Sequence, residues 1–116
     1  MVKQIPITDL AVVIRSKNSG PLELTFDIIF KDQQSFDLAV ASGIFSPALF
    51  ADLYKIPESR VLSVVEYAPA RAIKATILRN TVAGSVGDTD VYGAQQHAPL
   101  LAITVPMEGD EDADQG

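Results

Sequence analysis

Between Leu22 and Lys31 the sequence alternates between apolar and mostly polar residues with a period of two. This period is typical of a β-strand that has one buried face and one largely solvated face. The predicted buried face carries Leu22, Leu24, Phe26, Ile28 and Phe30. The pattern therefore predicts a sheet with one face packed against other elements of the chain.

Four other segments have the composition of strands: Leu10–Ile14, Val61–Tyr67, Ala72–Arg79 and Leu101–Val105. The first is apolar on both faces, which predicts a central position in the sheet. Pro69 separates the second from the third, since proline interrupts a strand pattern. Pro106 is expected to end the last one.

The middle of the chain predicts two helices. The first spans Asp32–Ser42, and Gly43 is placed where a helix commonly ends. The second begins at Ser46-Pro47, with serine as the N-cap and proline in the first turn. The apolar strand face is expected to pack on helical residues Phe36, Val40, Leu49, Phe50 and Leu53.

This order of elements predicts an α+β fold, a ferredoxin-like two-layer sandwich with a mostly antiparallel sheet and helices on one face. The 116 residues correspond to about one domain. We place this domain at residues 1–106. Residues 107–116 hold five acids and no base, and such a segment cannot bury enough apolar surface to stay ordered. We therefore expect an acidic disordered tail.

Composition excludes several classes of function. The chain has no cysteine, so disulfides, thiolate metal sites and cysteine nucleophiles are excluded. No apolar run approaches the roughly 18–20 residues that span a bilayer, and the N-terminus lacks a signal-peptide pattern. We expect a cytoplasmic protein with no membrane contact. Without the tail, the chain has ten acidic and nine basic residues, and it has no basic stripe. This composition argues against nucleic-acid binding.

The segment Thr81–Gln96 predicts a long loop, and loops above about 12–15 residues are usually functional or disordered. Imidazole and carboxylate groups can share acid and base roles near neutral pH. The candidate catalytic residues are His97, Asp88, Asp90 and Tyr92, and the candidate ligand contacts nearby are Gln95 and Gln96.

An alternative interpretation of this loop needs no chemistry. Asp88 and Asp90 could cap backbone groups in a turn, and His97 could begin a short helix that runs to Leu101. The spacing matches no established metal loop. We therefore predict no metal site and no cofactor.

A second predicted loop, Arg15–Pro21, offers positive charge. A guanidinium beside exposed backbone N–H groups suits a carboxylate or a phosphate. Arg15, Lys17 and Asn18 are therefore candidate anion-binding residues. The alternative is a solvated basic turn, in which Gly20-Pro21 makes a tight turn.

Three stretches resemble a small bacterial family, a domain of unknown function: Leu10–Phe30, Ala70–Arg79 and Gly84–Leu101. Its members resemble the ferredoxin-fold domain that accompanies acyclic-terpene-utilisation (AtuA-like) proteins, either fused to the large protein or as a separate chain. That domain carries an Arg-Ser-Gly-Asp-Lys-Gly loop at the place of residues 15–20. This sequence has Lys17 and Asn18 where the relative has glycine and aspartate.

The resemblance implies an accessory subunit of a larger AtuA-like protein that works on branched or unsaturated acids, as free acids or acyl-CoA esters. One alternative is a small lyase or hydratase. In it Arg15 and Lys17 would hold a substrate carboxylate, while His97, Asp88 or Tyr92 moves a proton. Another is a small-molecule binding module. We also expect a homo-oligomer, since a second copy commonly covers an exposed strand edge.

Overall fold

The computed structural model describes residues 2–20, 22–78 and 97–108 of the 116-residue chain. Its strands are β1 (Val2–Pro6), β2 (Ala11–Asn18), β3 (Glu23–Phe30), β4 (Val61–Tyr67), β5 (Ala72–Leu78) and β6 (Thr104–Glu108). Its α-helices are α1 (Ile7–Leu10), α2 (Gln33–Ser42) and α3 (Pro47–Tyr54). Short 3₁₀ helices occupy η1 (Glu58–Arg60), η2 (Ala68–Ala70) and η3 (Ala98–Ala102).

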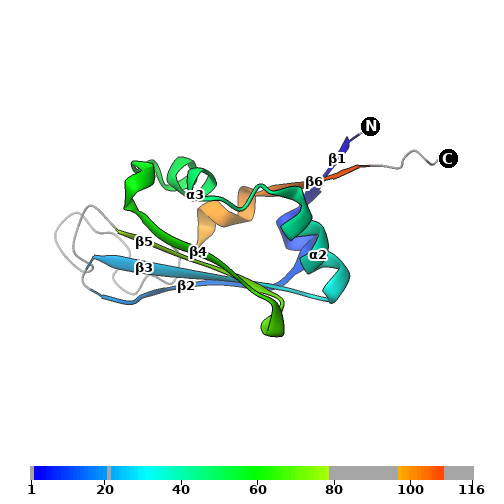
Figure 1. Cartoon of the computed structure of the whole chain (residues 1–116), viewed down its shortest axis with the longest axis horizontal. Helices are drawn as coiled ribbons and strands as arrows, with labels where there is room; N and C mark the ends of the chain where they lie inside the picture. The colour runs from blue at the N-terminus through cyan, green and yellow to red at the C-terminus, as the bar shows by residue number, and fades with distance from the viewer. Residues whose placement is uncertain (1, 21, 79–96, 109–116) are drawn as a thin grey trace.

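The strands form two antiparallel sheets. A four-stranded sheet, called the main sheet, has the order β2-β3-β5-β4, and β1 pairs with β6 in a two-stranded ribbon. Helices α2, α3 and η3 lie on one side of the main sheet, and the ribbon projects from the body beyond α2 (Figure 1). The predicted α+β class is confirmed. The strand order does not clearly show the βαββαβ topology of a ferredoxin-like fold.

Strand β3 forms the centre of the core, as its alternation predicts. Leu24, Phe26, Ile28 and Phe30 are each at most 1% exposed. Leu22 was predicted in this row, and that is wrong: it is 38% exposed. The chain turns just before β3, where the Ser19 N–H donates to the Glu23 carbonyl at 3.0 Å. Leu22 therefore lies in the turn.

The two predicted helices are confirmed, and they cover β3. Asp32 caps α2 by accepting a hydrogen bond from the Ser35 N–H at 2.8 Å, and Gly43 ends it with a φ of 72°. Ser46 occupies the N-cap of α3 but makes no side-chain capping bond. The helical residues that the sequence assigned to the core are buried or packed against it: Phe36, Val40, Leu49, Phe50 and Leu53.

Strand β2 differs from its prediction in two ways. It lies at an edge of the main sheet, so the central position was wrong. A bulge at Val12, which is 65% exposed, interrupts the pairing of the apolar run with β3. The strand also continues to Asn18, because the ladder with β3 extends to the pair Asn18–Leu24. The segment from Arg15 to Asn18 is therefore strand and not loop.

The ribbon corrects the C-terminal prediction. Leu101 belongs to η3, and the last strand starts at Thr104. Pro106 does not end that strand but pairs with Gln4 inside it. Proline is tolerated on edge strands, and both strands of a ribbon are edges. The strand runs to Glu108, past the predicted domain boundary at residue 106. The rest of the predicted tail lies outside the described residues.

Candidate functional site

The main sheet has one face that no described helix covers, and we call it the outer face. Side chains alternate along a strand and paired residues share a face, so the register assigns four rows to it. One of them, at the start of β3, holds Glu23 and Leu78. The charged row is Arg15, Asp27, Lys74 and Val65. The hydroxyl row is Lys17, Thr25, Thr76 and Ser63. The apolar row contains Val13, Ile29 and Tyr67.

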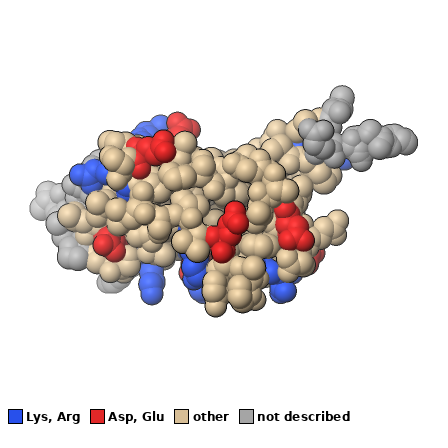
Figure 2. Space-filling model, viewed as in Figure 1, with Lys and Arg blue, Asp and Glu red and all other residues tan. Residues whose placement is uncertain are grey.

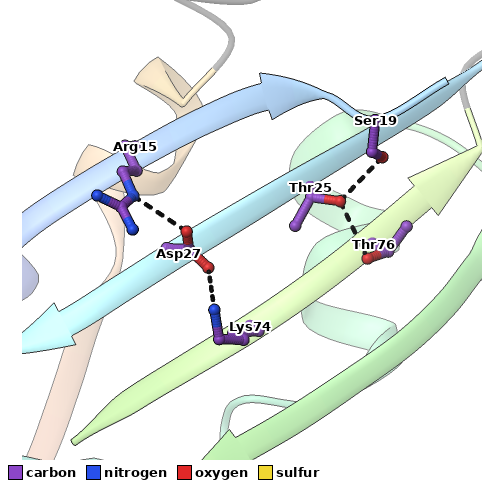
Figure 3. Close-up of polar contacts among 6 residues, drawn as sticks. All are labelled: Arg15, Ser19, Thr25, Asp27, Lys74 and Thr76. Carbon is purple, nitrogen blue, oxygen red and sulfur yellow. Dashed lines mark hydrogen bonds and ion pairs between the residues drawn. The ribbon is translucent and has the colours of Figure 1, made fainter. Parts of the chain in front are cut away.

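The charged row is an ion network across three strands (Figure 3). The Nε of Arg15 donates to Oδ2 of Asp27 at 3.0 Å, and Nζ of Lys74 donates to Oδ1 at 3.1 Å. The Asp27 side chain is 15% exposed, while those of Arg15 and Lys74 are 62% and 45% exposed. The carboxylate thus lies low between two cations that reach solvent.

The ionisation of Asp27 follows from these contacts. Burial by itself would raise the pKa of its carboxyl group. The hydrogen bonds from Arg15 and Lys74, together with their positive charge, outweigh burial and lower the pKa below its usual value. Asp27 is therefore an anion at neutral pH, and it holds both cations in place.

The hydroxyl row adds neutral polar groups beside the ion network. Oγ1 of Thr25 is 3.0 Å from Oγ of Ser19 and 3.3 Å from Oγ1 of Thr76 (Figure 3). Lys17 pairs with Thr25 and is exposed. In the view of Figure 2, Lys and Arg side chains protrude along the lower margin of the molecule, the side on which the outer face lies.

The structure separates the three predicted anion-binding residues. Arg15 and Lys17 lie on the outer face, two residues apart on β2. Asn18 pairs with buried Leu24 and so lies on the side of the helices. Asp27 and Lys74 were not predicted as site residues. The sequence shows each of them only as a polar residue within a strand pattern. Their proximity to Arg15 follows from the strand register, which the sequence alone does not show.

The predicted catalytic loop is described only at its end. Asp88, Asp90, Tyr92, Gln95 and Gln96 lie outside the described residues. His97 directly precedes η3, and its carbonyl accepts the Leu100 N–H at 2.8 Å, which confirms the predicted short helix. Its Nδ1 is buried and has no hydrogen-bond partner among the described residues.

The position of η3 bears on the lyase or hydratase hypothesis, in which Arg15 and His97 act on one substrate. Leu100 is fully buried in the core, and η3 lies on the helical side of the main sheet (Figure 1). Arg15 projects from the outer face. The structure therefore places Arg15 and η3 on different sides of the main sheet and does not bring them together.

Two cavities adjoin the ribbon at α2. One has a volume of about 270 Å³ and includes Ile5, Leu10 and Lys31 in its lining. The other has a volume of about 390 Å³ and includes Pro106. Leu38 and Met107 line both. The first cavity is also lined by the polar residues Asp32, Gln34 and Ser35, so its lining residues are half polar and half apolar.

Two classes of site are absent from the part of the chain that the structure describes. Residues 2–20, 22–78 and 97–108 contain no group of three or more His, Cys, Asp or Glu that could hold a metal ion. No single helix within these ranges is long and apolar enough to cross a membrane, and α2 and α3 meet the criterion only as a pair bent by 88°.

Comparison with protein families gives one match. Residues 7–104 match the family described as a domain of unknown function, DUF4387. No curated protein and no solved structure matches the chain. The match covers most of the chain and includes all of the main sheet.

Proposed function

The chain belongs to the DUF4387 family, and from this premise and the outer face we propose that it is an accessory subunit that docks on a larger protein. The family match confirms the predicted domain of unknown function. A relation to AtuA-like proteins is part of the proposal, and so is the ferredoxin-like interpretation of the fold. The docking surface is the outer face of the main sheet.

The observation that carries this proposal is the mixed character of the outer face. An antiparallel sheet can leave one face to water, and that face is then normally polar. Here Val65 and Tyr67 are 48% and 47% exposed beside the ion network, with Val13 and Ile29 half-buried next to them. Exposed apolar groups with a polar surround are typical of protein-interaction sites.

The resemblance supplies the candidate partner, a larger AtuA-like protein that acts on branched or unsaturated acids or their acyl-CoA esters. The cytoplasmic location belongs to the same proposal. Self-association through a sheet edge receives less support. Both edge strands of the main sheet carry a bulge, at Val12 and at Leu62, and bulges hinder edge-to-edge pairing.

A lyase or hydratase receives less support than docking. Such an enzyme needs an anion clamp and a proton-transfer group within reach of one substrate. Arg15 is bonded to Asp27 on the outer face, while His97 adjoins η3 on the other side of the main sheet. An active site built on both would have to be completed by another polypeptide.

A small-molecule binding module is the second candidate, and the two cavities beside α2 favour it. Their volumes are near the lower end of the range for ligand sites, about 300–1,000 Å³. They would suit a small acid with an apolar chain, because Leu38 and Met107 line both and Lys31 lines the first. A ligand there would shift the NMR signals of Leu38 and Met107, and unchanged signals with candidate acids would reject this function.

The accessory function is tested by co-expression with a candidate AtuA-like protein, followed by size-exclusion chromatography. We expect the two chains to elute together. Val65→Glu places a charge on the outer face and should abolish co-elution. Leu101→Glu is the matched control, because Leu101 is 45% exposed but belongs to η3 on the other side. Separate elution of the wild-type chains at every salt and substrate condition would reject the proposal.

A further inference from the structure

We infer that the partner segment covering the outer face is acidic and places its carboxylates against Arg15 and Lys74. The inference rests on the proposed function, because it names the chemistry of the partner at the same surface. It is independent of the identity of that partner.

The charges on the outer face carry the inference. Arg15 and Lys74 share a single carboxylate, that of Asp27, so the ion network keeps one net positive charge. Lys17 adds another exposed cation two residues from Arg15 on the same face, and Glu23 adds one partly exposed carboxylate at the start of β3. The chain as a whole has a formal charge of −6. With three cations against two carboxylates in these rows, the outer face keeps a net positive charge on an acidic protein.

The cations of the ion network are much more exposed to solvent than its carboxylate. The Asp27 side chain is 15% exposed, whereas the Arg15 and Lys74 side chains are 62% and 45% exposed. A partner that approaches this face meets the cations before the carboxylate. Anionic groups are thus the complementary chemistry.

The geometry also prepares the two cations for binding. Arg15 and Lys74 lie in register on either side of β3. Since neighbouring strands are about 4.8 Å apart, the backbones that carry the two cations are separated by about 9–10 Å. Asp27 limits the rotamers of both side chains, which reduces the entropy lost when a partner binds. Two carboxylates on one peptide segment could engage both cations.

Charge decides against a second copy of this chain as the occupant. Two outer faces packed together would bring one net positive row against another, and like charges disfavour that contact. An acidic peptide segment with apolar side chains matches both parts of the surface. Its carboxylates would contact Arg15 and Lys74, and its apolar groups would contact Val65 and Tyr67.

The test uses two synthetic peptide probes and the full chain. One is a fluorescein-labelled peptide in which glutamates alternate with valines, and the other carries glutamine in place of every glutamate. Fluorescence anisotropy measures their affinities at low and high salt. The variants are the double variant Arg15→Gln/Lys74→Gln, the single variant Lys17→Gln, and the control Lys3→Gln on β1.

We expect the wild-type chain to prefer the glutamate peptide, and added salt to weaken that preference. The double variant should lose about tenfold in affinity for the glutamate peptide, and Lys3→Gln should lose little. Lys17 is not part of the ion network, so Lys17→Gln keeps the test valid if the double variant unfolds. It should also weaken binding of the glutamate peptide.

Equal affinity for the two peptides would overturn the inference, as would an equal loss in Lys3→Gln and Lys17→Gln. Tighter binding of a single-stranded oligonucleotide, dependent on the same cations, would overturn it in favour of nucleic acid. The complex with the larger protein separates this inference from the proposed function. If Val65→Glu abolishes co-elution while Arg15→Gln/Lys74→Gln and Lys17→Gln leave it intact, docking stands and the acidic segment is rejected.

Discussion

Arg15 and Asp27 form a cross-strand pair on the outer face of the main sheet, with Nε of the arginine 3.0 Å from Oδ2 of the aspartate. Their side chains meet because the hairpin of β2 and β3 puts both residues at the same height and on the same face. Lys74 approaches the other carboxylate oxygen from β5. Arg15, which was predicted to bind an anionic ligand from a loop, is thus part of a strand and already paired with a carboxylate of its own chain.

The contribution of this network to stability should depend on pH. The pKa of Asp27 is lowered in the folded protein, so folding favours its ionised form. The stabilisation is present above the ordinary aspartate pKa of about 4 and is lost as the pH falls through the lowered folded value. We expect Asp27→Asn to reduce the free energy of unfolding by about 1 kcal/mol at neutral pH, because both cations are exposed.

Urea denaturation at neutral pH and in strong acid measures this effect. The stabilities of wild type and Asp27→Asn should converge in acid, where the wild-type carboxyl group is protonated. Asp52→Asn, at an exposed position of α3, is the control. A constant difference between wild type and Asp27→Asn across the pH range would contradict the assignment.

Phe26 should be among the costliest residues to truncate. Its side chain is fully buried, and its ring stacks on Tyr54 at a centroid distance of 4.7 Å and on Phe50 at 6.4 Å. We expect Phe26→Ala to lower the free energy of unfolding by about 3–5 kcal/mol in denaturant melts. Leu62→Ala, at a site that is 47% exposed, should change it by about 0.5 kcal/mol or less. A loss below about 1 kcal/mol for Phe26→Ala would contradict this packing.

Gly43 and Gly20 offer a matched pair of substitutions. Gly43 ends α2 in the left-handed region, with a φ of 72° and no atom within 4 Å of an added Cβ. Alanine there should cost about 1 kcal/mol through backbone strain alone. At Gly20 an added Cβ would meet Glu23 at 3.7 Å, an ordinary contact. In thermal unfolding, Gly43→Ala should have a lower melting temperature than Gly20→Ala. The reverse order would refute the strain argument.

The N-caps of α2 and α3 should respond differently to alanine. The Asp32 carboxylate accepts the Ser35 N–H, and this bond lowers the pKa of Asp32. Ser46 makes no such bond. We expect Asp32→Ala to lower the melting temperature and Ser46→Ala to leave it nearly unchanged. Because the capping group is an anion, the difference should shrink in acid. Equal effects at neutral pH would contradict the assigned cap.

The parts of the fold that follow from local pattern were predictable from the sequence. The alternation in β3 fixes which face is buried, and Asp32 with Gly43 marks both ends of α2. Leu22 continues the alternation by one residue, but the turn before Glu23 removes it from the strand. A sequence pattern therefore predicts whether a segment is a strand or a helix more accurately than it predicts the residue at which the segment begins or ends.

The parts that depend on distant pairing were not predictable. Leu10–Ile14 is a continuous apolar run, yet it divides between the end of α1, the bulge at Val12 and the edge strand β2. Strand β1 exists only through its pairing with β6, from the other end of the chain. No local signal near Pro106 shows that β6 passes through it.

The candidate site shows the same division. Arg15 was selected for its charge, but its direct partner, Asp27, lies 12 residues further along the chain. Asp27 also binds Lys74 of β5, which is 47 residues from Asp27 in the sequence. Only the register of the main sheet unites them. The candidates Asp88, Asp90 and Tyr92 lie outside the described residues, so their role stays a prediction.

Hydroxyl-radical footprinting of the co-purified complex tests the docking surface most directly. Tyr67 is 47% exposed on the outer face, whereas Tyr54 packs on Phe26 on the helical side. We expect the oxidation rate of Tyr67 to fall in the complex relative to the free chain, while that of Tyr54 stays constant. A complex in which Tyr67 is oxidised as fast as in the free chain would contradict docking through this face.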